Sequence, residues 1–340
     1  MKQTIVLALL GLLIFLFLSA KLNQSNLVTT VSQINVTKDA LAIEEMRQKS
    51  YPGSDLKIEQ TLDDGGNYHQ YIASYQSEGL KIYGLLTVPL GEKPNDGWPA
   101  ILFNHGYIPP AQYQTTEKYV DYVNAFASNS YIVFKSDYRG HGQSQGEPSG
   151  AYYSPAYTVD VLNALSSLKK FPDANPNKIG MWGHSLGGNI TLRSLVISSA
   201  DIKAAVIWNG VVGTYDDLMN NWRRRVTYSP PPNQLALRSL HRNNLIKKYG
   251  SLADNPNFWH SIDPNYYIQD IAAPVQLHAG LSDEEVPWQF SEGLYNRLKE
   301  AKKEVKFYTY LEADHNLSQP FSVAIQRSID FFDQYLKGGE

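Results

Sequence analysis

The sequence predicts an α/β fold in which helices cover both faces of a mostly parallel central sheet. From Pro99 onward, short β-forming apolar runs alternate with segments of helical periodicity, which is typical of a parallel sheet. A Gly-x-Ser-x-Gly pattern at residues 183–187 stands between one such strand and the next helix. Residues 214–267 break the alternation, and a structureless loop of that length is unusual in a compact domain. We therefore expect a helical cap insertion there, with an inert insertion as the alternative.

The predicted elements follow in a consistent order along the chain. Residues 57–89 carry strand signals, with alternation at 68–75 and β-forming residues at 80–89, and predict an antiparallel start to the sheet. Further strands are predicted at residues 99–103, 131–134, 178–182, 203–208, 274–279 and 305–310. Helices are predicted at residues 39–48, 117–128, 156–170, 189–197, 289–301 and 321–336.

The composition indicates a globular protein and excludes several kinds of chemistry. The 340 residues are 43% hydrophobic, and the net charge of −3 offers no general electrostatic attraction for nucleic acid. The chain has no cysteine, which excludes disulfides, thiol catalysis and cysteine-ligated zinc. No motif predicts a cofactor or a metal site. The expected partner is a small-molecule substrate.

The N-terminal region predicts a location outside the cytoplasm. Residues 4–20 are almost wholly apolar and follow Lys2, a length between the core of a signal peptide and a spanning helix. Leu18 stands where signal cleavage requires a small residue, which favours an uncleaved membrane anchor over a cleaved, secreted form. Residues 21–55 are expected to be a tether with a short helix. Residues 56–340 then form the main domain.

The stretch around Ser185 predicts a nucleophile. A strand, a Gly-x-Ser-x-Gly turn and a helix in succession are the context of a nucleophile elbow, which holds a serine in a strained turn above the sheet. The serine then lies at a helix N-terminus, where backbone amides favour developing negative charge. The sequence therefore predicts Ser185 as the attacking group.

A serine hydroxyl needs a base to take its proton and an acid to orient that base. In this arrangement the chain order is serine, acid, histidine, and His315 lies in the loop after the last predicted strand. Asp283 follows the preceding strand and is the predicted acid. Glu284 and Glu285 are alternatives, although we interpret them as acids in the first turn of the next helix.

An oxyanion requires two backbone donors. One is the N–H of Leu186, which directly follows the predicted nucleophile. The other is expected from the loop after the strand at 99–103, where Gly106 allows a tight turn and the N–H of Tyr107 is the predicted donor. His105 in the same loop is interpreted as structural.

These motifs resemble the α/β-hydrolase superfamily and, more narrowly, the catalytic domain of the prolyl oligopeptidase family. The resemblance covers roughly residues 80–336 and includes Asp137-Tyr138-Arg139-Gly140 and Asp283 before Val286-Pro287. It implies an α/β-hydrolase fold and a triad of Ser185, Asp283 and His315.

The chain departs from that family in one respect, because only about sixty residues stand between the apolar run and the predicted hydrolase core, and no β-propeller fits there. It is also similar to small capped esterases, including feruloyl-type ones. We therefore expect a carboxylester hydrolase, with a peptidase of small peptides as the alternative. A non-catalytic binding protein is a third hypothesis. Residues 223–225, three arginines, are either contacts for an anionic substrate or a solvated surface.

Overall fold

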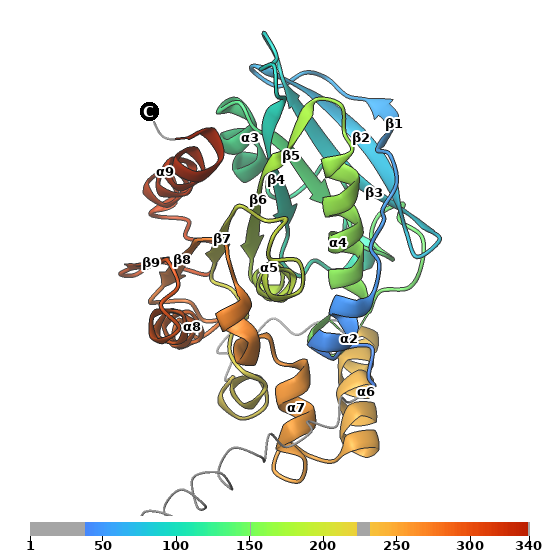
Figure 1. The fold of residues 1–340 in the computed structure, drawn as a ribbon, viewed down its shortest axis with the longest axis vertical. Coiled ribbons are helices and arrows are strands. Elements are labelled where there is room, and N and C mark those ends of the chain that lie inside the picture. The colour runs from blue at the N-terminus through green and yellow to red at the C-terminus, as the bar shows by residue number, and fades with distance from the viewer. Residues whose placement is uncertain (1–37, 150, 223–231, 339–340) are drawn as a thin grey trace, which may run out of the picture. The chain divides into compact units, whose positions relative to one another are not determined.

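The computed structural model describes residues 38–149, 151–222 and 232–338 of the chain. Their strands form one nine-stranded sheet in the order β1-β2-β3-β5-β4-β6-β7-β8-β9 (Figure 1). The strands are β1 (Lys57–Thr61), β2 (Tyr68–Ser77), β3 (Leu80–Pro89), β4 (Trp98–Asn104), β5 (Ile132–Ser136), β6 (Ala174–His184), β7 (Ala204–Trp208), β8 (Val275–Gly280) and β9 (Val305–Tyr310).

The pairing of the strands confirms a mostly parallel sheet with an antiparallel start. Strands β1, β2 and β3 pair antiparallel, and β3 joins β5 antiparallel. All pairs from β5 through β4 and β6 to β9 are parallel. Asn104 lies opposite Gly183, and His184 lies opposite Trp208. Since parallel strands end at the same edge, the loops after β4, β6 and β7 meet there.

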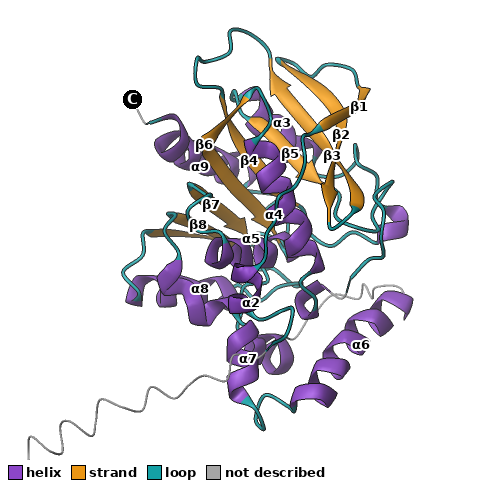
Figure 2. Cartoon of the chain, turned by 45° about the vertical axis from the view of Figure 1, so that its right-hand side comes forward, coloured by secondary structure: helices purple, strands orange, loops and turns teal. Residues whose placement is uncertain are grey.

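Helices cover both faces of the sheet, as predicted (Figure 2). Helices α3 (Val120–Ser128) and α9 (Phe321–Phe332) lie on one face, where Phe126, Trp182 and Phe332 belong to one buried cluster. The other face carries α4 (Ala156–Lys169), α5 (Leu186–Ile197) and α8 (Gln289–Glu300). A sheet covered on both sides explains why its central strands are apolar throughout.

The predicted starts of α3 and β6 are wrong. Helix α3 begins at Val120 instead of residue 117, because Lys118 and Tyr119 have φ angles of 56° and 57°, which a right-handed helix excludes. Strand β6 begins at Ala174, four residues earlier than the pattern indicates, since its first residues include the polar Asn175 and Asn177.

The described part of the segment 214–267 is helical, as predicted. It holds α6 (Pro232–Tyr249) and α7 (Pro256–Ile262), a π-helical turn at Asp217–Asn221 and a 3₁₀ segment at Pro264–Asp270. No strand occurs among its described residues. The three arginines at 223–225 lie outside the described residues.

The apolar run at residues 4–20 also lies outside the described residues. Within the part of the chain that the structure describes, no helix is both long enough and apolar enough to cross a membrane. The described residues before β1, from 38 onward, pack against the domain. Helix α2 (Ile43–Gln48) starts four residues later than predicted and buries Ile43 and Met46 in the core.

Arg193 of α5 joins this N-terminal segment to the insertion. Its buried guanidinium donates hydrogen bonds to the carbonyl oxygen of Leu41 at 3.1 Å and of Ile262 at 2.8 Å. It also donates to the hydroxyl of Tyr215 at 3.3 Å. One side chain therefore supplies donors to three segments that are distant in sequence.

We expect Arg193→Met to lower the free energy of unfolding by about 2 kcal/mol or more, because each buried acceptor left without a donor costs about 1–3 kcal/mol. Urea denaturation monitored by circular dichroism measures this change. Lys49→Met, at an exposed position after α2, is the control and should leave the midpoint unchanged. An unchanged midpoint for the Arg193 variant would contradict the anchoring role.

Candidate active site

Ser185 occupies the sharp turn between β6 and α5. Its backbone has φ 55° and ψ −118°, a conformation that L-residues rarely adopt. The turn is held from several sides: the Ser185 N–H donates to the carbonyl of Trp208 at 3.1 Å, and its own carbonyl accepts from Val211 and Gly188, each at 3.0 Å. This is the strained elbow that the sequence predicts.

Gly187 allows α5 to approach β4 closely enough to form the elbow. A Cβ atom at this position would lie 1.9 Å from the carbonyl oxygen of Asn104, well inside van der Waals contact. Neither atom belongs to a flexible side chain, so a rotamer change cannot relieve the clash. The packing of α5 against β4 therefore requires a glycine at position 187, two residues after Ser185.

We expect Gly187→Ala to destabilise the protein by about 1–3 kcal/mol or more, the scale of overpacking in a core, and to abolish hydrolysis by displacing the elbow. Thermal unfolding and steady-state kinetics measure the two effects. Gly66→Ala is the matched control, since a Cβ there meets nothing within 4 Å. If Gly187→Ala kept both stability and activity, the proposed packing at the elbow would be wrong.

The structure brings His315 and Asp283 together. The imidazole Nδ1 of His315 lies 2.7 Å from Oδ2 of Asp283, and the two side chains are 9% and 0% exposed. The second carboxylate oxygen, Oδ1, accepts hydrogen bonds from the backbone N–H groups of Glu285 at 2.8 Å and Val286 at 2.9 Å. The carboxylate is therefore fixed at both oxygens, with one directed at the histidine.

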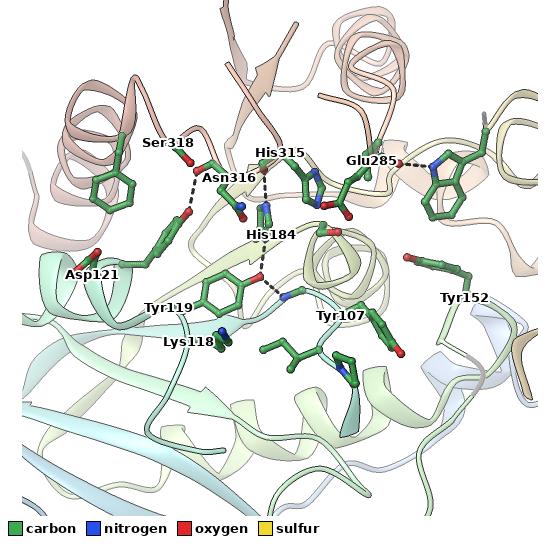
Figure 3. A pocket seen from close by; sticks show the side chains of 18 residues that line it. Tyr107, Lys118, Tyr119, Asp121, Tyr152, His184, Glu285, His315, Asn316 and Ser318 are labelled. Carbon is green, nitrogen blue, oxygen red and sulfur yellow. Dashed lines mark hydrogen bonds between the residues drawn. The ribbon is translucent and has the colours of Figure 1, made fainter. Parts of the chain in front are cut away.

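The alternative acids have other surroundings. Glu284 is exposed, and Glu285 lines the cavity beside His315 (Figure 3). Our interpretation of both as acids in the first turn of a helix is wrong, because α8 begins only at Gln289. Instead, the backbone N–H groups of Glu285 and Val286 donate hydrogen bonds to Asp283, so residues 283–286 form a tight loop.

Ser185 and His315 open into one cavity of about 660 Å³. This volume lies in the range of small-molecule sites. The lining is aromatic with three charged side chains, and includes Tyr107, Tyr119, Tyr122, Tyr152, Trp222, Phe321, Lys118, Asp121 and Glu285 (Figure 3). The cavity therefore offers apolar surface and a few polar anchors around the serine.

The predicted oxyanion donors flank this serine. Leu186 is the first residue of α5, and the first N–H groups of a helix have no partner within the helix. Tyr107 lines the cavity next to Gly106, in the loop after β4. His105 is buried and stacks between Tyr113 and Tyr138 at 4.8 and 4.2 Å, which agrees with a structural role.

The sequence did not predict a role for His184 in the site. Its ring lies 4.6 Å from the ring of His315, and it is hydrogen-bonded to the hydroxyl of Tyr119 and the backbone oxygen of His315. Burial, with His315 nearby, lowers the pKa of His184 to about 3, so its imidazole is neutral. No local pattern predicts this network, because its members come from three segments that are far apart in the sequence.

Among the described residues, no group of three or more His, Asp or Glu side chains is placed to hold a metal ion.

The chain is similar in sequence to several known proteins. Residues 99–250 match a family model described as "Serine aminopeptidase, S33". The "Uncharacterized peptidase YtmA" of Bacillus subtilis is 25% identical over 247 residues, which cover 72% of this chain and 85% of that protein. The "Uncharacterized protein YfhR" of Escherichia coli O157:H7 is 27% identical over 182 residues, so the match spans about half of each protein, 53%.

Solved structures show the same fold. The acylaminoacyl peptidase of Pyrococcus horikoshii has a TM-score of 0.63 at 22% identity, with 81% of this chain and 43% of that chain covered. The acetyl xylan esterase from Paenibacillus sp. R4 also has a TM-score of 0.63, at 18% identity, with 86% of this chain and 92% of that chain covered. This chain is an α/β-hydrolase serine hydrolase.

The site of this serine hydrolase contains two features that the motifs do not reveal. Trp222 reaches the cavity from the insertion and donates its indole N–H to the carbonyl of Glu285 at 2.8 Å. Tyr152 reaches it from a short 3₁₀ helix, Ala151–Tyr153, that precedes α4 (Figure 3). Both aromatic side chains lie in segments without regular periodicity, which explains why sequence patterns give no signal for them.

Proposed function

We propose that this serine hydrolase cleaves carboxylic esters of small molecules through an acyl-enzyme on Ser185. The observation that carries the proposal is the 2.7 Å hydrogen bond between His315 and Asp283, at the cavity that the strained Ser185 also lines. His315 acts as the base, Asp283 orients it, and the N–H groups of Tyr107 and Leu186 stabilise the oxyanion.

The proposed reaction has two steps. The Ser185 oxygen attacks the ester carbonyl while Nε2 of His315 takes its proton, and that proton then passes to the departing alcohol. Water attacks the acyl-enzyme in the same way, returning a carboxylic acid and free Ser185. Asp283 accepts a hydrogen bond from the Nδ1–H of His315 throughout, so in the resting enzyme Nε2 is unprotonated and can take the Ser185 proton.

Several observations support esters of small molecules as the substrates. The cavity holds a compound of modest size, and its aromatic lining suits an apolar acyl or alcohol group. We propose that residues 214–267 form the cap that selects the substrate, and the position of Trp222 in the cavity supports this role. The nearly full-length match to an esterase of similar size points in the same direction.

A peptidase of small peptides is the second candidate. The "Serine aminopeptidase, S33" model and the name of the Bacillus relative favour it. The same triad serves both reactions, because the proton that goes to an alcohol goes equally to an amine. The two functions therefore differ only in what the cavity accepts.

A substrate panel on the full-length chain separates the two candidates. Short p-nitrophenyl esters are compared with aminoacyl and proline-containing p-nitroanilides at equal concentration. We expect kcat/KM to be higher for the esters, and turnover of the amides alone would overturn the ester proposal. The Ser185→Ala variant corrects for background hydrolysis in both arms.

We further propose that residues 4–20 export the protein and either anchor it to the membrane or are removed. The support is the apolar composition of the run after Lys2. Fractionation of cells that express the chain with and without residues 1–20 tests this. Equal amounts of both forms in the soluble cytoplasmic fraction would contradict it.

A further inference from the structure

The hydroxyl of Tyr119 lies where three parts of the site meet. It accepts a hydrogen bond from the N–H of Gly106 at 2.8 Å and lies 2.7 Å from Nδ1 of His184. The other ring nitrogen of His184, Nε2, lies 2.8 Å from the backbone oxygen of His315. These contacts link the loop after β4 to the loop after β9, and Figure 3 shows the part that joins Tyr119, His184 and His315, which all line the cavity.

The direction of each hydrogen bond follows from its partners. A carbonyl oxygen only accepts, so Nε2 of His184 carries the proton that it shares with His315. Because burial keeps the His184 ring neutral, its Nδ1 is an acceptor, and the Tyr119 hydroxyl donates to it. Burial also raises the pKa of Tyr119, so the hydroxyl keeps this proton.

Tyr119 is placed by an unusual turn. Lys118 and Tyr119 both have left-handed backbone angles, φ 56° and 57°, and consecutive non-glycine residues of this kind persist only where surrounding structure holds them. The holding group is Lys135 of β5, which is completely buried. Its ammonium donates to the carbonyl oxygens of Glu117 at 3.0 Å and Lys118 at 3.2 Å.

The loop that bears Tyr107 packs directly against this arrangement. A Cβ at Gly106 would lie 2.6 Å from the Tyr119 hydroxyl and 3.2 Å from Cβ of Ser185. The position of the Gly106 backbone therefore depends on where the Tyr119 oxygen stands. The next amide along the chain is that of Tyr107, one of the proposed oxyanion donors.

We propose that Tyr119 is a positioning residue for the hydrolysis reaction. Tyr119 fixes the loop of the oxyanion donor Tyr107 relative to the backbone of His315, and Lys135 holds Tyr119 in place. This inference rests on the proposed acyl-enzyme mechanism. The Tyr119 hydroxyl does not contact the substrate. It acts on the reacting atoms through its hydrogen bonds to Gly106 and His184.

The test is Tyr119→Phe, which removes the hydroxyl and keeps the ring that packs edge-on against Phe103 at 5.5 Å and Trp182 at 6.3 Å. Complete loss of an oxyanion donor lowers kcat by about 10²–10³-fold, so we expect a misplaced donor to lower it by about 10–100-fold. KM should change by less than about twofold, because ground-state binding does not use the oxyanion donors.

Affinity for a trifluoromethyl ketone gives a readout that a purely structural role would not move. This compound forms a tetrahedral adduct whose oxyanion uses the same donors, so its binding should weaken by the same factor as kcat/KM. Tyr68→Phe is the matched control: it removes another tyrosine hydroxyl that bonds to helix α3, through Asn124 at 3.0 Å, and should leave kcat unchanged.

Lys135→Met provides a second arm. If Lys135 acts through Tyr119, the variant should lower kcat at constant KM, and the double variant should lose little more than the greater single loss. Should Lys135→Met fail to fold, Tyr119→Phe still decides the proposal. Unchanged kcat and inhibitor affinity for Tyr119→Phe in an active enzyme would overturn it, as would lower thermal stability alone. Wild-type protein that hydrolyses no ester or amide would instead overturn the proposed function.

Discussion

Replacing Ser185 by alanine is expected to lower kcat by about 10⁶-fold, the scale measured when the nucleophile of a serine-hydrolase triad is removed. The reason is that no acyl-enzyme forms without the Ser185 oxygen, so only the binding site and the oxyanion donors remain. Steady-state hydrolysis of a p-nitrophenyl ester by freshly purified variant protein measures the loss. Circular dichroism and the thermal midpoint show whether the fold is retained.

Two results would contradict this expectation. A folded Ser185→Ala protein with more than about one hundredth of the wild-type kcat would show that another group attacks the substrate. A neighbouring serine provides the control: Ser194 lies buried in the same helix, away from the cavity, and Ser194→Ala should retain ordinary activity. Equal losses in both variants would indicate a general effect on α5.

Replacing Asp283 by asparagine is expected to lower kcat by about 10³–10⁴-fold with the fold intact, as for other triads whose acid is made neutral. The structure indicates how the amide would sit. Two backbone N–H groups, those of Glu285 and Val286, require an acceptor at the present Oδ1. The amide nitrogen is therefore directed at His315, where it donates to Nδ1 and leaves the proton on Nε2.

A histidine in that tautomer cannot accept the Ser185 proton, and a neutral amide does not stabilise the imidazolium. Kinetics at neutral pH measure the loss, with circular dichroism as the check of folding. Glu284→Gln is the control and should cost less than about tenfold, because Glu284 is exposed. A fully active Asp283→Asn enzyme together with an inactive Glu284 or Glu285 variant would move the acid along the loop.

Much of this site was predictable because its chemistry follows chain order. The elbow at Ser185 is a local pattern, and the positions of Asp283 and His315 follow from the ends of the last strands of a parallel sheet. Each prediction needed only the sequence near one strand and the rule that parallel strands end at a common edge.

The supporting network was not predictable in the same way. Tyr119, His184 and Lys135 make contacts between segments that are far apart in the chain, and none has a spacing that marks it. The left-handed angles at residues 118 and 119 are set by tertiary contacts, and they explain why the predicted start of α3 was three residues early. The secondary-structure propensities of neighbouring residues do not encode such tertiary contacts.

Covalent labelling tests the central claim most directly. Folded full-length protein is treated with a fluorophosphonate, digested and analysed by mass spectrometry, with and without prior acid denaturation. We predict one equivalent of label on Ser185, none on denatured protein, and much slower labelling of Asp283→Asn. Label on a different residue, or no label on folded protein that binds substrate, would contradict the assignment of Ser185 as the nucleophile.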